Sequence, residues 1–241
     1  MKSRRGKIGV AYFPGTNCQA ESKNAIEACG VNVELVQYQL VLGGQVNMLD
    51  YIAWLIAGGF SWGDHYLSGR IAGKVMRDKF MEFVATGRPL LGICNGDQVI
   101  FEAGLFDSPT HKGGALVQNA CGHFVSPPTG IELVVEKTGT PWTEGIEGAV
   151  LRMPVAHGEG RWLPPEGGAP HLTPAYRYVR DGKPTMTFPH NPSGSPDGIA
   201  GFVYNNVCGM MPHPERVARE ELGYAPGLLI IRNFVNYALG A

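Results

Sequence analysis

The sequence has few charged residues, and the two signs nearly cancel. Only 17% of its 241 residues are Asp, Glu, Lys or Arg, and the formal net charge is -1. Nucleic acids and anionic membrane surfaces attract proteins through an excess of basic residues. This chain has no such excess, so we predict neither a nucleic-acid partner nor a membrane partner.

Long apolar runs and paired cysteines are also lacking. The longest apolar stretch, residues 53–60, is far shorter than the about 20 residues that a membrane-spanning helix needs. The apolar run after the basic start, residues 8–13, is too short for a signal peptide. The 5 cysteines are odd in number, widely spaced and without a C-x-x-C pair. We therefore expect a cytoplasmic protein with neither a disulfide framework nor a zinc ribbon.

Glycine is plentiful, and strand-like segments alternate with helix-like segments in the first half of the chain. We predict strands there at residues 7–13, 31–37, 53–57 and 89–93, and helices at 21–29, 69–86 and 95–103. Such alternation is typical of βαβ units with a parallel sheet. Later segments indicate antiparallel strands at 131–137, 149–155 and 176–180, further strands at 199–211, and a final helix at 227–239.

No linker divides the sequence into two regions. We therefore predict one α/β domain over residues 1–241, built on a mostly parallel central sheet flanked by helices, with added antiparallel strands.

A cysteine stands between a predicted strand and a predicted helix, in Gly92-Ile93-Cys94-Asn95-Gly96. A nucleophile on such a turn projects clear of the sheet, and the flanking glycines allow the strand and helix backbones to approach closely. The helix N-terminus favours a thiolate, and the Asn95 N–H can donate to an oxyanion. We interpret Cys94 as a nucleophile; the alternative is a small buried structural cysteine.

A catalytic thiol needs a base and a group that orients the base. His213 and Glu215 are separated by one proline and preceded by another. Prolines keep the segment out of a helix, and residues i and i+2 of an extended segment project to the same side. Glu215 can then bond one ring nitrogen while the other faces Cys94. A solvated pair on a surface turn is the alternative, but beside a cysteine elbow the pattern indicates a triad.

Two loops supply further candidates. His157 is followed by Gly158 and Gly160 in residues 156–160, where close approach of a ligand and an ordinary polar loop are both adequate explanations. A glycine loop at residues 58–64, which begins Gly58-Gly59-Phe60, follows a predicted strand at the sheet edge where ligands bind, and its N–H groups could complete an oxyanion hole. An ordinary glycine turn is the alternative. No nucleotide-binding glycine motif or complete metal-ligand set occurs in the sequence, so we predict no ATP, NAD or metal site.

Together these segments resemble the class I, triad-type glutamine amidotransferases, whose fold is a flavodoxin-like α/β domain. Within that class they look like the glutaminase subunits of phosphoribosylformylglycinamidine synthase. The similar stretches span nearly the whole chain, at residues 13–18, 58–64, 92–96 with Gln98, 116–119, 154–160, 191–195 and 209–216.

The resemblance implies a role for each candidate residue. Cys94 would be the nucleophile, His213 the base and Glu215 the group that orients it. The residues implied at the bound glutamine or its oxyanion are Gly59, Phe60, Asn95, Gln98 and His157.

The implied reaction hydrolyses L-glutamine to glutamate through a γ-glutamyl thioester and releases ammonia. A large synthetase subunit (PurL-like) would use this ammonia, with ATP and Mg²⁺, to convert formylglycinamide ribonucleotide to formylglycinamidine ribonucleotide in purine (IMP) biosynthesis. A small third subunit (PurS-like) is also implied, and no cofactor is expected in this chain. The alternatives are another triad amidotransferase, a γ-glutamyl hydrolase, or a non-catalytic interaction module on the same fold.

The sequence departs from the family pattern at two positions. Gln19 replaces the acidic residue that often follows the early cysteine, and Asp97 stands where an aromatic residue is general. A carboxylate beside the sulfur would oppose thiolate formation through like-charge repulsion. We therefore expect Asp97 to point away from Cys94.

Overall fold

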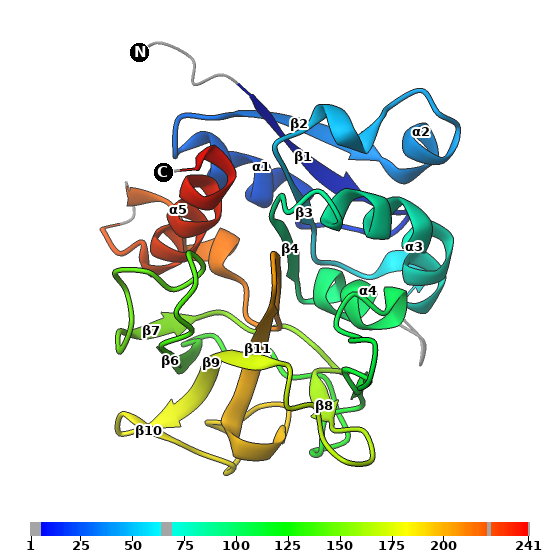
Figure 1. Ribbon diagram of the computed structural model, residues 1–241. Coiled ribbons are helices and arrows are strands. Elements are labelled where there is room, and N and C mark those ends of the chain that lie inside the picture. The colour runs from blue at the N-terminus through cyan, green and yellow to red at the C-terminus, as the bar shows by residue number, and fades with distance from the viewer. Residues whose placement is uncertain (1–5, 64–68, 221–222, 241) are drawn as a thin grey trace.

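One continuous sheet joins the two halves of the chain in the computed structural model, which describes residues 6–63, 69–220 and 223–240 (Figure 1). One side of the sheet is parallel, with the strands in the order β2 (Asn32–Gln37), β1 (Lys7–Tyr12), β3 (Ala53–Ile56), β4 (Leu90–Ile93) and β12 (Val207–Met210). The antiparallel side continues with β11 (Ile199–Tyr204), β9 (Thr173–Arg180), β6 (Ile131–Val135) and β7 (Val150–Met153), with β10 (Lys183–Pro184) paired to β9. The predicted α/β architecture is confirmed, and a single domain over residues 1–241 stays a prediction.

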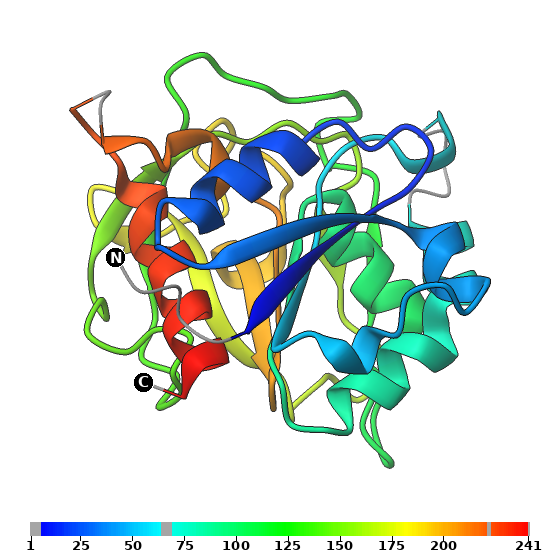
Figure 2. The ribbon, with the colours of Figure 1, turned by 90° about the horizontal axis from the view of Figure 1, so that it is seen from above.

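Helices cover both faces of this sheet (Figures 1 and 2). On one face lie α1 (Gln19–Glu27) and α5 (Pro226–Leu239), and on the other α2 (Tyr38–Leu42), α3 (Arg70–Val84) and α4 (Asn95–Ala103). Successive side chains of a strand point to opposite faces. Leu55 therefore packs in the core under α1 and α5, while Trp54 and Ile56 pack in the core under α3 and α4.

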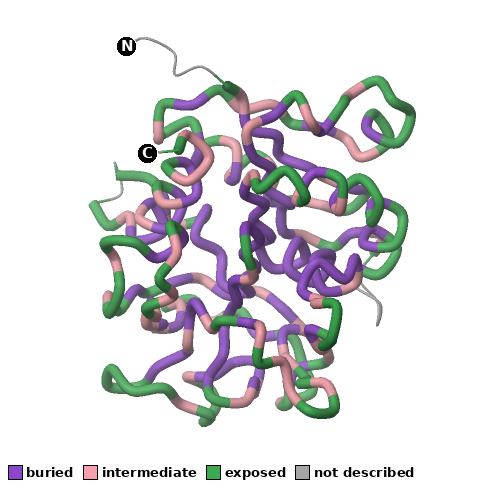
Figure 3. Tube along the Cα trace, viewed as in Figure 1, coloured by how far each residue is buried: buried purple, intermediate pink, exposed green. Residues whose placement is uncertain are grey.

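Burial follows from this layering, because the central strands are covered on both sides (Figure 3). Strands β3, β4 and β12 have four residues each, and every one of these residues is buried. Such continuous apolar segments are typical of parallel strands with helices on both faces. Within the part of the chain that the structure describes, no helix is long and apolar enough to cross a bilayer.

The predicted boundaries of the longer elements agree with the structure to within a few residues, and the predicted helix at 95–103 coincides with α4. Short elements were not predicted: helix α2, and the separate antiparallel pair β5 (Ala115–Val117) and β8 (Arg161–Leu163). Segments of three to five residues are too short to carry a recognisable period. Asp64, at the end of the predicted glycine loop, and the chain ends at 1–5 and 241 lie outside the described residues.

Two glycines allow α4 to pack directly on the sheet at the start of the helix. A Cβ added to Gly92 of β4 would lie 2.6 Å from the Gly96 carbonyl oxygen. A Cβ added to Gly96 would overlap the carbonyl oxygen of Ile56 in β3. Contacts this close exclude any side chain, so the first turn of α4 depends on glycine at both positions.

Gly96→Ala is expected to destabilise the protein although it lies in a helix. Alanine is favoured over glycine in a helix interior by about 1 kcal/mol. The overlap with the Ile56 carbonyl nevertheless forces α4 to move, and we expect a net loss of about 1–3 kcal/mol in the free energy of unfolding. Urea denaturation measures it. Gly158→Ala is the control, because its added Cβ would meet only Phe124 Cδ2, at 3.8 Å. Equal midpoints for the two variants would contradict the packing argument.

Candidate active site

Cys94 occupies the turn between β4 and α4, at the carboxyl end of a parallel strand. Its backbone has φ 53° and ψ -106°, a left-handed conformation that non-glycine residues rarely adopt. The Cys94 N–H donates to the Met210 carbonyl of β12 at 2.7 Å, which fixes the turn to the neighbouring strand. The sulfur lies 3.6 Å from the Ala156 carbonyl oxygen. The strained strand-to-helix turn expected of a nucleophile elbow is therefore present.

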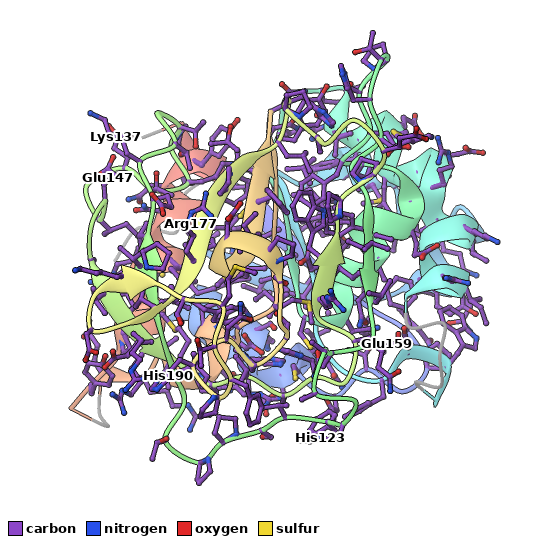
Figure 4. The ribbon with its side chains drawn as sticks, turned by 90° about the horizontal axis from the view of Figure 1, so that it is seen from below. His123, Lys137, Glu147, Glu159, Arg177 and His190 are labelled. Carbon is purple, nitrogen blue, oxygen red and sulfur yellow. The ribbon has the colours of Figure 1, made fainter. Side chains whose placement is uncertain are left out.

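The first turn of α4 connects the elbow to two loops. The Asn95 side-chain oxygen accepts from the Ser61 N–H at 3.4 Å, and its amide nitrogen donates to Gln98 Oε1 at 2.8 Å. Gln98 in turn donates to the Glu159 carbonyl at 2.7 Å; Glu159 is labelled in Figure 4. The Asn95 backbone N–H belongs to the first helical residue, which has no intrahelical acceptor. This N–H therefore remains available beside Cys94.

His213 and Glu215 form a buried hydrogen-bonded pair. His213 Nδ1 donates to Glu215 Oε1 at 2.6 Å, and the two residues are only 1% and 3% exposed. A solvated surface pair is thereby excluded. The predicted pairing is present, but the predicted extended conformation is wrong for Glu215, which lies in the short 3-10 helix Pro214–Val217. The tight turn, rather than the pleat of a strand, brings the carboxylate back to the ring.

The imidazole of His213 lies next to Cys94 because Gly58 separates them with no side chain. A Cβ added to Gly58 would lie 3.0 Å from His213 Cε1 and 3.5 Å from Cys94 Cβ. Burial lowers the pKa of His213, but the Glu215 carboxylate and then the Cys94 sulfur raise it well above its ordinary value. This arrangement favours a protonated imidazole beside the Cys94 sulfur, which is the positively charged neighbour that a cysteine nucleophile needs.

A second thiol, Cys18, belongs to the same cluster, and the sequence interpretation assigned it no role. It is 1% exposed, and its sulfur accepts from Arg216 Nη2 at 3.1 Å. The sulfur also lies within 4.8 Å of ligand-type atoms of His213 and Glu215. Its position in the segment 13–18, which resembles the family, was the available signal. The contact with Arg216 joins the start of α1 to the segment that carries His213 and Glu215.

The charges around this cluster bear on the predicted absence of a metal. Within residues 6–63, 69–220 and 223–240, Cys18, His213 and Glu215 are the one group of His, Cys and acidic side chains close enough to share an ion. The Arg216 guanidinium contacts the Cys18 sulfur and lies 4.0 Å from Glu215 Oε1. A fixed positive charge there opposes a bound cation. No resident metal remains our prediction for this cluster.

His157 is buried beside the pair and held by Asn119. Asn119 Oδ1 accepts from the Gly160 N–H at 3.0 Å, so it is an acceptor, and His157 Nδ1 donates to it at 3.0 Å. Burial, and then the charge of His213, lower the pKa of His157 to about 3. The ring is therefore neutral, and its Nε2 has no hydrogen-bond partner among the described residues. Asn119 was not singled out by the sequence interpretation except within the stretch 116–119.

The glycine loop contributes its backbone. Gly59 has φ +146°, and a Cβ there would lie 2.6 Å from the Asn17 nitrogen, so the loop runs against residues 16–17. The Phe60 N–H donates to the Gly15 carbonyl at 3.0 Å and is thus already used. The Phe60 ring is 38% exposed and lies 6.2 Å from the Phe124 ring, measured between centroids. Of this loop, Gly59 is the better candidate for an oxyanion donor.

Comparison with known proteins agrees with the geometry of the site. A model of the CobB/CobQ-like glutamine amidotransferase domain matches residues 5–224. The chain belongs to this glutamine amidotransferase family. It is 37% identical to phosphoribosylformylglycinamidine synthase subunit PurQ of Pyrococcus furiosus, over 96% of this chain and 98% of the relative. It is 41% identical to the subunit of the same name from Pyrobaculum aerophilum, over 87% of each chain.

Solved structures contain the same amidotransferase fold. A chain in the structure of PurLQS from Thermotoga maritima matches with a TM-score of 0.79 and 30% sequence identity, over 96% of this chain and 98% of that one. A further glutamine amidotransferase from Thermotoga maritima matches with a TM-score of 0.61 and 13% identity, over 98% and 99% of the two chains. The second likeness shows the fold alone.

Glu215→Gln is expected to shift the pH dependence of glutamine hydrolysis by this amidotransferase. The amide keeps the size of the side chain but removes the charge that raises the pKa of His213, so that pKa falls. Imidazolium then loses its proton at lower pH, and the alkaline limb of kcat/KM moves to lower pH. We also expect kcat/KM near neutral pH to fall on the order of 10²–10⁴-fold. An unshifted alkaline limb would show that Glu215 does not control the proton on His213.

Cys18→Ala is expected to impair hydrolysis without removing any triad residue. Arg216 loses its acceptor and can compete with His213 for the Glu215 carboxylate. We expect kcat/KM for glutamine to fall about tenfold, or roughly 1.4 kcal/mol of barrier. Cys18→Ser keeps an acceptor and should lose less. Cys29→Ala is the matched control, because the Cys29 sulfur donates to the Ala25 carbonyl, at 3.6 Å, away from the His213–Glu215 pair. Equal rates for Cys18→Ala and Cys29→Ala would refute this positioning role.

Proposed function

We propose that this chain is the glutaminase subunit of a phosphoribosylformylglycinamidine synthase, with Cys94, His213 and Glu215 as its catalytic residues. The observation that carries the proposal is the buried His213–Glu215 pair beside the strained Cys94 turn. Relatives named PurQ, aligned along nearly the whole chain, support the choice of synthase.

In the first half of the reaction, the Cys94 thiolate attacks the side-chain amide carbon of L-glutamine. The carbonyl oxygen becomes an oxyanion, which the N–H groups of Asn95 and Gly59 stabilise. The His213 imidazolium gives its proton to the amide nitrogen as the C–N bond breaks. Ammonia leaves, and a γ-glutamyl thioester on Cys94 remains.

In the second half, the thioester is hydrolysed. Neutral His213 accepts a proton from a water molecule as the water oxygen attacks the thioester carbon. Cleavage of the C–S bond releases glutamate and restores the Cys94 thiolate and the His213 imidazolium. Glu215 keeps Nδ1 protonated throughout, so that only Nε2 exchanges protons with the substrate and water.

The residues around the triad would hold the glutamine. His157 remains neutral, and its free Nε2 is a hydrogen-bonding group for substrate beside the triad. Gln98 acts less directly, since both ends of its amide already bond Asn95 and the Glu159 carbonyl. It positions the first turn of α4 against the loop that carries His157.

The ammonia would pass to a large PurL-like synthetase subunit, which binds ATP and Mg²⁺, in an assembly with a small PurS-like subunit. The similarity to a chain of the PurLQS structure supports this assembly. The exposed rings of Phe60 and Phe124 provide apolar surface beside the site. A cytoplasmic location agrees with the free thiols of all five cysteines. This chain needs no cofactor for the hydrolysis.

Cys94→Ala is expected to abolish glutamine-dependent synthesis by the assembled enzyme while leaving ammonia-dependent synthesis intact, because only the thioester step is lost. Treatment of the wild-type chain with a glutamine-mimetic electrophile, followed by mass spectrometry, should place one adduct on Cys94. Cys121 is a half-buried thiol outside the proposed triad, so the Cys121→Ala variant should still be labelled at Cys94. Glutamine use by Cys94→Ala, or an adduct on another cysteine, would reject the assignment.

A further inference from the structure

The carboxyl of Asp97 is buried beneath the first turn of α4 without a hydrogen-bond partner for its Oδ1 among the described residues. Asp97 is 2% exposed. Its Oδ1 packs against Gly209 of β12, where an added Cβ would overlap it. Burial raises the pKa of Asp97 well above its ordinary value, which favours the neutral acid, an O–H donor, over the carboxylate. The neutral form would place no negative charge near the Cys94 sulfur.

Asp97 lines a small cavity with otherwise mostly apolar walls. The cavity has a volume of about 10 Å³, which is room for a single molecule of the size of water. The rings of Phe101, Trp162 and Phe202 form part of its wall. Such walls disfavour an ion, because an ion would lose its hydration without gaining an opposite charge. The lining instead suits one small neutral molecule that accepts a hydrogen bond from the Asp97 acid.

The cavity shares its walls with the segments that build the active site. Asp97 follows Cys94 by three residues, and its N–H donates to the Cys94 carbonyl at 2.9 Å. Gly160, also in the wall, packs on His157: a Cβ added there would lie 2.6 Å from His157 Nδ1. Met211, a third wall residue, precedes His213 by two positions. The wall of the cavity is therefore formed in part by residues that directly adjoin Cys94, His157 and His213 in the chain or in space.

We propose that this cavity is a holding site for ammonia, in which the Asp97 O–H donates a hydrogen bond to the nitrogen. The inference rests on the proposed glutaminase function, which supplies the ammonia. Ammonia has the size of water, is neutral, and is a stronger proton acceptor than water. The neutral pair of acid and ammonia suits aromatic walls better than an ammonium carboxylate pair, whose two charges would both be desolvated.

Difference infrared spectroscopy of the full chain tests the site directly. The carbonyl stretch of a buried carboxylic acid, assigned by its loss in Asp97→Asn, should shift when ammonia is added at constant pH, and conversion to carboxylate bands would contradict the neutral pair. Methylamine, which carries one more carbon, should leave the band unchanged because the cavity holds only one water-sized molecule. Absence of a carboxylic acid band, no response to ammonia, or an equal response to methylamine would each overturn the proposal.

The same titration on Cys94→Ala separates this inference from the proposed function. That variant makes no ammonia, so its response to added ammonia depends on the cavity alone. A wild-type chain that responds to ammonia but hydrolyses no glutamine would refute the glutaminase and leave the ammonia site standing.

A second measurement uses the assembled enzyme. Asp97→Leu removes the donor, and the ammonia that escapes to solvent per glutamine hydrolysed should rise about two- to tenfold, the range expected for loss of one hydrogen bond. Asp97→Asn keeps an N–H donor and should leak less than Asp97→Leu. Leakage equal to that of the wild type in both variants would contradict a role for the cavity in holding ammonia.

Discussion

A carboxylate as buried as Glu215 needs a positive charge beside it, because an unpaired charge in a protein interior costs several kcal/mol. His213 supplies that charge at 2.6 Å only while it stays protonated. Cys94 lies across Gly58 from the ring, and its sulfur also raises the pKa of His213. The protonation of His213 thus depends on both neighbours, and loss of either one lowers its pKa.

This electrostatic unit requires segments far apart in the sequence to approach to contact distance. Gly58 lets the ring reach the cysteine, and Gly92 and Gly96 let α4 pack on the strands so that Cys94 is lifted into its left-handed turn. Arg216 and Cys18 then hold the His213 segment against the start of α1. The sheet holds these segments in place, and the glycines, which have no side chains, allow the close contacts between them.

The sequence allowed prediction of those features that depend on residues close together in the chain. The Cys94 elbow is a strand, a turn and a helix in succession, and His213 and Glu215 are two residues apart, so both could be inferred from spacing. Cys18 and Asn119 act through contacts with residues 198 and 38 positions away, and no local pattern carries such contacts. The Phe60 N–H looked available in the sequence, but the fold gives it Gly15 as an acceptor.

At Asp97 the expectation from the sequence and the environment in the structure differ most. A carboxylate three residues after a thiolate predicts repulsion, and repulsion would weaken the nucleophile. Burial over Gly209 makes the ionised form costly and raises the pKa of Asp97, so the neutral acid is favoured and the repulsion is reduced. The same burial leaves an O–H group facing a cavity behind the elbow. Protonation of Asp97 thus removes a negative charge near the Cys94 sulfur and also provides the O–H group that we propose donates to ammonia.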